Sequence, residues 1–194
     1  MPSTGPEVVV VRHGETEWSA ARKHTGSTDV PLTDAGRREA EGLGAQLAGR
    51  EFARVLTSPL SRAEETCRIA GLGDRAEVRD DLREWDYGEY EGVTTAEIRS
   101  QRPEWRLWRD GCPGGESPAQ VGARADRVIA ELRGLDGDAA VFGHGHLLRV
   151  LTARWLDLPP ARGACFALST GALGVLGWER EDAAIWLWNR TPGG

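Results

Sequence analysis

Val8-Val9-Val10-Val11-Arg12-His13-Gly14 is the stretch that decides the fold. Four consecutive β-branched residues are typical of a short strand that is buried on both faces of a sheet. Arg12 and His13, a permanent cation and an imidazole, follow it, and open α/β sheets carry their reactive groups where the strands end. Gly14 would let the backbone approach a ligand closely. Taken alone, the motif is equally well interpreted as a polar strand end, because short motifs are only hypotheses.

A second apolar run favours a reactive site over an ordinary polar strand end. Ala139 to Phe142 leads directly into His144, Gly145 and His146. Two buried strands that both end near a His-Gly pair would bring two imidazoles together at one edge of a sheet. The sequence therefore predicts a site built from segments far apart in the chain.

The rest of the chain alternates between strand and helix patterns. A further strand is predicted over 54–57, and antiparallel hairpin strands over 171–178 and 184–188. Helices are predicted over 33–49, 96–102, 118–133 and 147–156, together with one that begins with Ser58 as N-cap and Pro59 in its first turn. Residues 80–92 and 110–117 are interpreted as functional loops. This order predicts one α/β domain over residues 1–194, a three-layer α/β/α sandwich with a mostly parallel central sheet and a C-terminal antiparallel hairpin.

Composition excludes several classes of function. The net charge of −6 disfavours a nucleic-acid partner, which needs a basic surface. No apolar run approaches the roughly 18 residues of a membrane span. The three cysteines (Cys67, Cys112 and Cys165) have no metal-type spacing and predict neither a disulfide framework nor a zinc site. Met1 to Glu7 has no signal-peptide pattern, so we expect a cytoplasmic protein. A homodimer is left open, since the tryptophans of the hairpin fit either a core or an interface.

Two further residues complete a constellation at the predicted sheet edge. Arg62 lies in the first turn of its helix, where a cation is unfavourable unless an anion occupies the same place. Glu84 lies in the acidic, Gly-punctuated loop 80–92. Cations and imidazoles could surround a phosphoryl group, one neutral imidazole could attack phosphorus, and a carboxylic acid could protonate the leaving oxygen. Such chemistry needs no metal and no cofactor, and we expect neither.

The motifs together resemble the histidine phosphatase superfamily, the phosphoglycerate-mutase-like phosphatases. They run in family order: Val11-Arg12-His13-Gly14-Glu15-Thr16, Leu32-Thr33-xx-Gly36, Ser58-Pro59-xx-Arg62-Ala63, Glu84-Trp85-xx-Gly88, Gly115-Glu116-Ser117 and His144-Gly145. The resemblance implies a metal-independent phosphatase in which His13 is the phosphorylated nucleophile and Glu84 the proton donor. It also implies a phosphate pocket completed by Arg12, Arg62 and His144.

The resemblance also extends to mutases and to one branch of phosphatases. Extra cations of the mutases are replaced here by Thr95 and Asp110, and their Asn by Ser19, which favours hydrolysis over isomerisation. The branch that contains sedoheptulose-bisphosphatase-like enzymes and actinobacterial acid phosphatases is the most similar, and it implies a small-molecule phosphomonoester, a sugar phosphate, as substrate. A phosphoglycerate-type mutase and a non-catalytic phospholigand-binding module are the alternatives. Expected substrate-binding residues are Gly14, Ser19, His24, Thr25, Gly26, Tyr87, Arg109, Gly145 and His146.

Four of these residues also have ordinary structural explanations. His24 fits a solvated loop, Tyr87 fits packing, Arg109 fits a surface ion pair and His146 fits a helix cap. The sequence favours neither interpretation for any of them.

Overall fold

One six-stranded sheet, with strand order β3-β2-β4-β1-β5-β6, organises the computed structural model, which describes residues 3–193. The ends of the predicted domain, residues 1, 2 and 194, lie outside that described part. The strands are β1 (Val8–Arg12), β2 (Arg54–Thr57), β3 (Ala76–Val78), β4 (Ala139–Gly143), β5 (Leu173–Glu179) and β6 (Asp182–Arg190). Strands β3, β2, β4 and β1 pair in parallel, while β5 and β6 are antiparallel. The mostly parallel sheet and the C-terminal hairpin are thus confirmed.

The two strands that end near histidines are neighbours in the middle of the sheet. β1 and β4 pair so that Val11 lies opposite Phe142 and Arg12 opposite Gly143. Both strands are almost completely buried, as their apolar sequences predict. Because the register is level, the residues that follow the two strands, His13 and His144, leave the sheet side by side.

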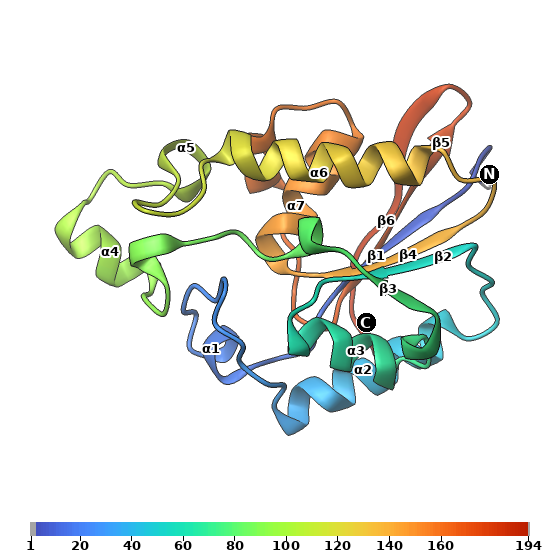
Figure 1. The fold of residues 1–194 in the computed structure, drawn as a ribbon, viewed down its shortest axis with the longest axis horizontal. Helices are drawn as coiled ribbons and strands as arrows, with labels where there is room; N and C mark the ends of the chain where they lie inside the picture. Colours follow the sequence, from blue (N-terminus) through green and yellow to red (C-terminus); the bar gives the residue numbers. More distant parts are fainter. Residues whose placement is uncertain (1–2, 194) are drawn as a thin grey trace.

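Helices cover both faces of the sheet (Figure 1). They are α1 (Glu17–Ala20), α2 (Asp34–Leu47), α3 (Ser61–Ile69), α4 (Thr95–Gln101), α5 (Leu107–Asp110), α6 (Pro118–Arg133) and α7 (Gly145–Trp155). Alternate valines of β1 divide between two cores: Val8 and Val10 pack with α6 and α7, Val9 and Val11 with α2 and α3. Short helices α1, α4 and α5 lie beyond the carboxyl ends of the parallel strands, at the left of Figure 1.

One predicted cap is wrong. Ser58 does not cap α3; the N-cap is Leu60, whose side chain makes no capping hydrogen bond. Ser58 is fully buried two residues earlier, where its hydroxyl contacts His144 instead. The Ser-Pro pair resembles a helix start, but the chain runs on from β2 for three residues before it turns into the helix. Strand β3 and the single-turn helices α1 and α5 were not predicted either.

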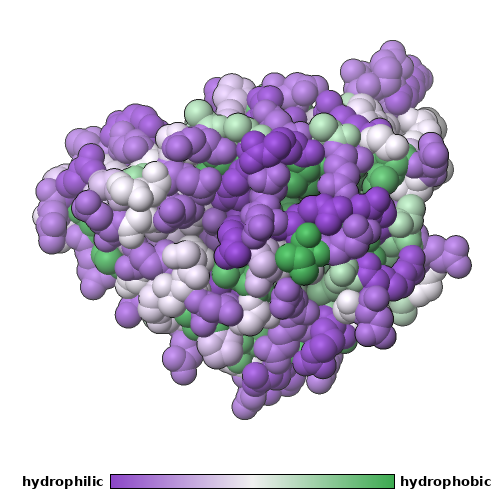
Figure 2. All heavy atoms as spheres, in the orientation of Figure 1, coloured by the Kyte–Doolittle hydropathy of each residue, from purple (hydrophilic) through white to green (hydrophobic). Residues whose placement is uncertain are grey.

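No helix among residues 3–193 is long and apolar enough to cross a membrane. The face of the molecule in Figure 2 is mainly hydrophilic, with apolar residues in small separate patches. The cytoplasmic location and the homodimer stay predictions.

Candidate active site

His13 presents one ring nitrogen with a free electron pair. Its Nδ1 lies 2.7 Å from the carbonyl oxygen of Gly14, which can only accept a hydrogen bond. In the neutral ring the proton is therefore on Nδ1, and Nε2 keeps its electron pair. Burial, followed by the positive charges of Arg62 and Arg12, lowers the pKa of His13 well below its usual value. The imidazole is thus held in the form that can act as a nucleophile.

His144 lies next to His13, with 5.1 Å between the ring centroids. Its Nδ1 accepts a hydrogen bond from Arg62 Nε at 3.2 Å, so Nε2 carries the proton and donates to the hydroxyl oxygen of Ser58 at 2.7 Å. Burial and the charge of Arg62 lower the pKa of His144 well below its usual value. Ser58, the residue of the wrong cap prediction, therefore fixes the ring of the second histidine.

Two guanidinium groups, those of the buried Arg62 and the half-buried Arg12, lie beside these rings without a carboxylate partner. Arg62 donates to the backbone carbonyl oxygens of Thr25, Gly26 and Thr28, at 3.0 to 3.1 Å. Arg12 donates to Leu168 O at 2.6 Å, and its Nε is buried with no partner. Neither side chain forms an ion pair within residues 3–193. Backbone dipoles orient both cations but leave their charge uncancelled, which favours an anion beside them.

Glu84 is held by the N-terminus of α7. Its Oε1 accepts from the backbone N–H groups of Trp85 (2.9 Å) and Leu147 (2.8 Å), and its Oε2 accepts from the N–H of His146 (2.9 Å). The carboxyl group is buried, with 8% of the residue exposed. Because Oε2 accepts only one of the three hydrogen bonds, it is the oxygen with more room for a further hydrogen-bond partner.

These groups enclose a cavity of about 290 Å³, the phosphate cavity. Its lining residues are Arg12, His13, Ser19, Arg22, Lys23, His24, Thr25, Glu84, Tyr87, Thr95, Gly145, His146 and Arg149. The structure thus brings most of the predicted site residues together, with Arg62 and His144 packed directly behind His13. Arg22, Lys23 and Arg149 were missed, since isolated basic residues in a loop or a helix give no sequence signal.

Three predicted binding residues lie outside this lining. The N–H of Gly14 donates to Thr66 Oγ1, and that of Gly26 to the carboxylate of Glu91. Arg109 is exposed and pairs with Asp110 at 2.7 Å. That bond lowers the pKa of Asp110 to about 2. A binding role for these three residues stays a prediction.

Tyr87, His24 and His146 form one cluster at the cavity wall. The hydroxyl of Tyr87 lies 2.6 Å from His146 Nδ1, and the Tyr87 and His24 rings are 4.8 Å apart. Burial raises the pKa of Tyr87 well above its usual value, so its hydroxyl keeps the proton and shares a hydrogen bond with His146 Nδ1. The backbone of the same His146 donates to Glu84, which links the cluster to the carboxyl group.

An ion pair between the buried Arg124 and the half-buried Glu116, which sequence reasoning missed, holds the loop of Glu84. Arg124 in α6 donates to three carbonyl oxygens of that loop: Asp81 at 2.8 Å, Arg83 at 2.6 Å and Glu84 at 3.0 Å. It also binds both carboxylate oxygens of Glu116, at 2.8 and 2.9 Å. Glu116 is the middle residue of the Gly-Glu-Ser motif, so the sequence did single it out. Its partner Arg124 can be recognised only from the position of α6 in the fold.

Comparison with known proteins identifies the family to which this chain belongs. The pattern of the histidine phosphatase superfamily (branch 1) matches residues 8–191. The chain belongs to that superfamily. It is 45% identical to an acid phosphatase of Mycobacterium tuberculosis over 89% of this chain and 86% of the relative. It is 39% identical to the sedoheptulose 1,7-bisphosphatase of Saccharomyces cerevisiae over 81% of this chain and 70% of the relative.

Solved structures agree with this assignment. The solved structure of a protein encoded by an open reading frame of Mycobacterium tuberculosis superimposes on this chain with a TM-score of 0.92 at 41% identity. The match covers 96% of this chain and 98% of that one. Phosphoglycerate mutases that depend on 2,3-bisphosphoglycerate are also similar in sequence to this chain. The superfamily is thus settled, and it includes phosphatases as well as mutases among the relatives.

Proposed function

We propose that this superfamily member is a phosphomonoester hydrolase that works through a phosphohistidine on His13 and takes a small sugar phosphate as substrate. The observation that carries the proposal is the neutral His13, with Nε2 free, beside the guanidinium groups of Arg12 and Arg62, which have no carboxylate partner. A phosphate dianion would supply the missing negative charge and place its phosphorus next to Nε2.

The proposed reaction has two steps. In the first, Nε2 of His13 forms a bond to phosphorus while the bond to the substrate oxygen breaks, and Glu84 gives its proton to that oxygen. In the second, Glu84 takes a proton from water as the water oxygen attacks phosphorus, the P–N bond breaks and inorganic phosphate leaves. Arg12 and Arg62 stabilise the charge on the phosphoryl oxygens in both steps. No residue in this scheme calls for a metal ion.

Two positions beside the cavity favour hydrolysis over isomerisation. A mutase must hold a doubly phosphorylated intermediate while the phosphoryl group moves between two positions. Here Thr95 lines the cavity as a neutral residue, and Asp110 neutralises the neighbouring Arg109. Water then competes better for the phosphohistidine. Isomerisation of 3-phosphoglycerate without phosphate release would favour the mutase instead.

Replacement of Glu84 by Gln tests the role of the acid. We expect Glu84→Gln to slow the hydrolysis of alkyl phosphates by about 10²- to 10⁴-fold, the usual size of general acid catalysis. Single-turnover phosphohistidine formation from an aryl phosphate should fall far less, because aryl oxides leave without a proton. Equal losses for alkyl and aryl substrates in that first step would contradict this role.

His13→Ala tests the covalent step. Rapid acid-free denaturation during turnover should trap labelled phosphate on the wild-type protein and none on the variant, while the variant still binds inorganic phosphate. Retained turnover in His13→Ala would exclude the proposed mechanism. Binding with no turnover in the wild-type protein would instead identify a phospholigand-binding module.

A further inference from the structure

Two backbone segments hold the end of β1. After the strand, the carbonyl oxygen of Gly14 accepts the Nδ1 proton of His13 at 2.7 Å, which leaves Nε2 free. In the turn before β5, Leu168 O accepts from Arg12 Nη1 at 2.6 Å. The N–H of Gly171, in the same turn, donates to the carbonyl oxygen of His13 at 3.0 Å. The proposed nucleophile and one of its two guanidinium groups therefore depend on these segments for their placement.

The carboxylate of Glu39, in α2, joins the two segments. Its Oε2 accepts from the N–H of Glu15 at 2.8 Å, in the segment that follows His13. Its Oε1 accepts from the hydroxyl of Thr170 at 3.3 Å, in the turn before β5. That turn packs directly on the side chain, since a Cβ on Gly171 would lie 2.5 Å from the Cβ of Glu39. One carboxylate therefore fixes the spacing between the two segments.

Glu39 is not held in place by a cation. Within residues 3–193 its carboxylate forms no ion pair, and its hydrogen bonds go only to Glu15 and Thr170. The side chain is half-buried, and a carboxylate taken out of water costs free energy that its hydrogen bonds must offset. Glu41, two residues later in α2, is exposed, as is usual for a charged helix residue. The position of Glu39 is therefore explained by the two segments that it binds.

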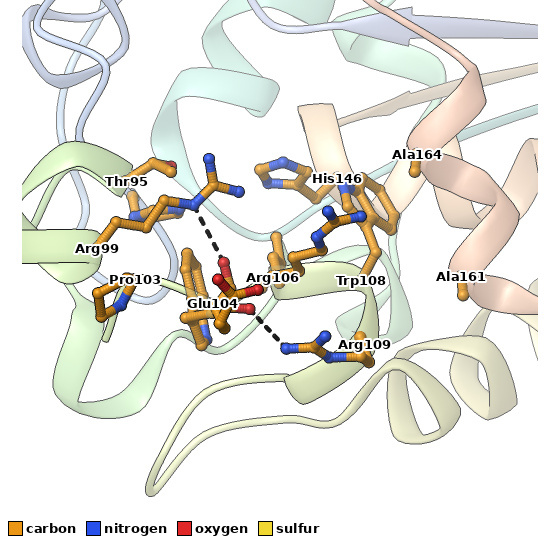
Figure 3. Close-up of a pocket in the computed structure, with 13 residues that line it drawn as sticks. Thr95, Arg99, Pro103, Glu104, Arg106, Trp108, Arg109, His146, Ala161 and Ala164 are labelled. Atoms are coloured by element: carbon orange, nitrogen blue, oxygen red, sulfur yellow. Dashed lines mark hydrogen bonds between the residues drawn. The ribbon is translucent and has the colours of Figure 1, made fainter. Parts of the chain in front are cut away.

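Glu39 does not reach the space in which a substrate would bind. It lines neither the phosphate cavity nor the larger hollow of about 750 Å³ shown in Figure 3, which shares His24, Thr95 and His146 with that cavity. It lines, with Thr170, a separate hollow of about 310 Å³ that has no lining residue in common with either. Any effect of Glu39 on the reaction must therefore pass through the residues that it holds.

The charge of Glu39 also acts on Arg12. Burial lowers the pKa of Arg12, and Glu84, Tyr87 and Glu39 act against that shift. Arg12 donates to a backbone carbonyl and not to Glu39, and its Nε has no partner. The carboxylate therefore supports the cation without occupying the donors that a phosphoryl group would need.

Building on the proposed function, we infer that Glu39 is a positioning residue for phosphoryl transfer to His13. It keeps the segment that fixes the tautomer of His13 and the turn that orients Arg12 at one spacing, so that Nε2 and the guanidinium meet the same phosphoryl group. A misplacement of about 1 Å in such an arrangement can cost about 100-fold in rate. Glu84 lies in another loop, so proton transfer to the leaving oxygen does not depend on Glu39.

Glu39→Ala tests this role through the step that it affects. Single-turnover formation of phosphohistidine from p-nitrophenyl phosphate should slow by about 10- to 100-fold. The kcat for alkyl phosphates should fall by a similar factor, whereas KM should change little, because the other groups of the phosphate cavity still bind the ester. This pattern differs from that of Glu84→Gln, which spares the aryl substrate.

Two further variants of α2 separate positioning from general stability. Glu39→Gln should stay within about threefold of the wild-type rate, because its amide oxygen can accept from Glu15 and its amide nitrogen can donate to the Thr170 hydroxyl. Glu41→Ala is the matched control, since it removes the same charge from an exposed position of the same helix. We expect normal phosphohistidine formation in that control.

A change in the turn provides a test that leaves α2 intact. Thr170→Val removes one of the two hydrogen bonds of Glu39, and the rate of phosphohistidine formation should fall by about 3- to 10-fold. Nitrogen NMR of the imidazoles adds a spectroscopic measurement. The Nδ1–H signal of His13, assigned by its absence in His13→Ala, should weaken in Glu39→Ala as the ring loses its fixed tautomer.

The outcomes distinguish this inference from the proposed function. A wild-type protein that forms no phosphohistidine contradicts the proposed function itself. If phosphohistidine forms, an unchanged rate in a folded Glu39→Ala protein overturns the positioning role. If Glu39→Ala does not fold, an unchanged rate in Thr170→Val overturns it. A loss that Glu39→Gln does not recover, that appears only in KM, or that Glu41→Ala shares also overturns it.

Discussion

Arg124→Met should remove a large part of the stability of the protein. The substitution leaves the half-buried carboxylate of Glu116 without its cation and three carbonyl oxygens of the Glu84 loop without their donor. Breaking a buried ion pair in this way costs about 3–5 kcal/mol of unfolding free energy. For a chain of this length each kcal/mol lowers Tm by about 2–4 °C, so Tm should fall by about 6–20 °C.

Arg127→Met is the matched control. Arg127 lies three residues later in the same helix and contacts the carboxylate of Asp81, but its side chain is 63% exposed. Water and salt screen such pairs, and we expect almost no change in Tm. Thermal unfolding of both variants, followed by circular dichroism, measures the difference. Equal Tm values for the two variants would refute the view that Arg124 holds the Glu84 loop.

A kinetic measurement separates the loop from general stability. Well below its Tm, Arg124→Met should lose more activity toward alkyl phosphates than toward p-nitrophenyl phosphate, because a displaced Glu84 affects the substrates that need a proton. Arg124→Lys keeps the charge but has one nitrogen in place of the planar fork, so it should restore only part of that activity. Full activity of Arg124→Met toward alkyl phosphates would show that the loop does not depend on this contact.

Two further predictions concern pH and packing. Burial lowers the pKa of all four histidines of the site: His13, His24, His144 and His146. Below about pH 6.5 the unfolded chain therefore binds more protons than the folded protein. The free energy of unfolding should fall from about pH 7 to pH 5, by up to about 1.4 kcal/mol per pH unit for each histidine. Equal urea midpoints at both pH values would contradict this expectation. Gly14→Ala should prevent stable folding, because its Cβ would lie 2.2 Å from the backbone oxygen of Gly36, whereas Gly134→Ala, with no contact under 3.5 Å, should leave soluble yield and Tm nearly unchanged.

The central strands and the proposed catalytic groups were predictable because each has a local signature. Four valines before Arg-His and a second apolar run before Gly-His identify β1 and β4 directly. Strand β3 has no such signature, since Glu77 and Val78 are exposed at the edge of the sheet and only pairing with β2 makes them a strand. Helices α1 and α5 are single turns, too short to show a 3.6-residue period.

Contacts between distant segments were the part that the sequence could not predict. Nothing in the sequence around Arg124 indicates that Glu116 is its partner. Within α6, Arg124 has the sequence pattern of an ordinary charged helix residue. The two histidine rings could be expected to meet, but the hydrogen bond from Arg62 that fixes the tautomer of His144 depends on side-chain orientation. Pocket shape is likewise a property of the packed α4 and α5 region, and not of any short motif.

The place of β1 in the sheet has a consequence for biosynthesis. Its partners on either side, β4 and β5, lie more than a hundred residues further along the chain and are made later in translation. Until then Val8–Val11, an uncharged β-branched segment, has both edges open, and such segments are prone to aggregate. A ribosome-bound chain must therefore shield this strand until its partners have been made, which makes chaperone supply and translation speed determinants of the yield of folded protein.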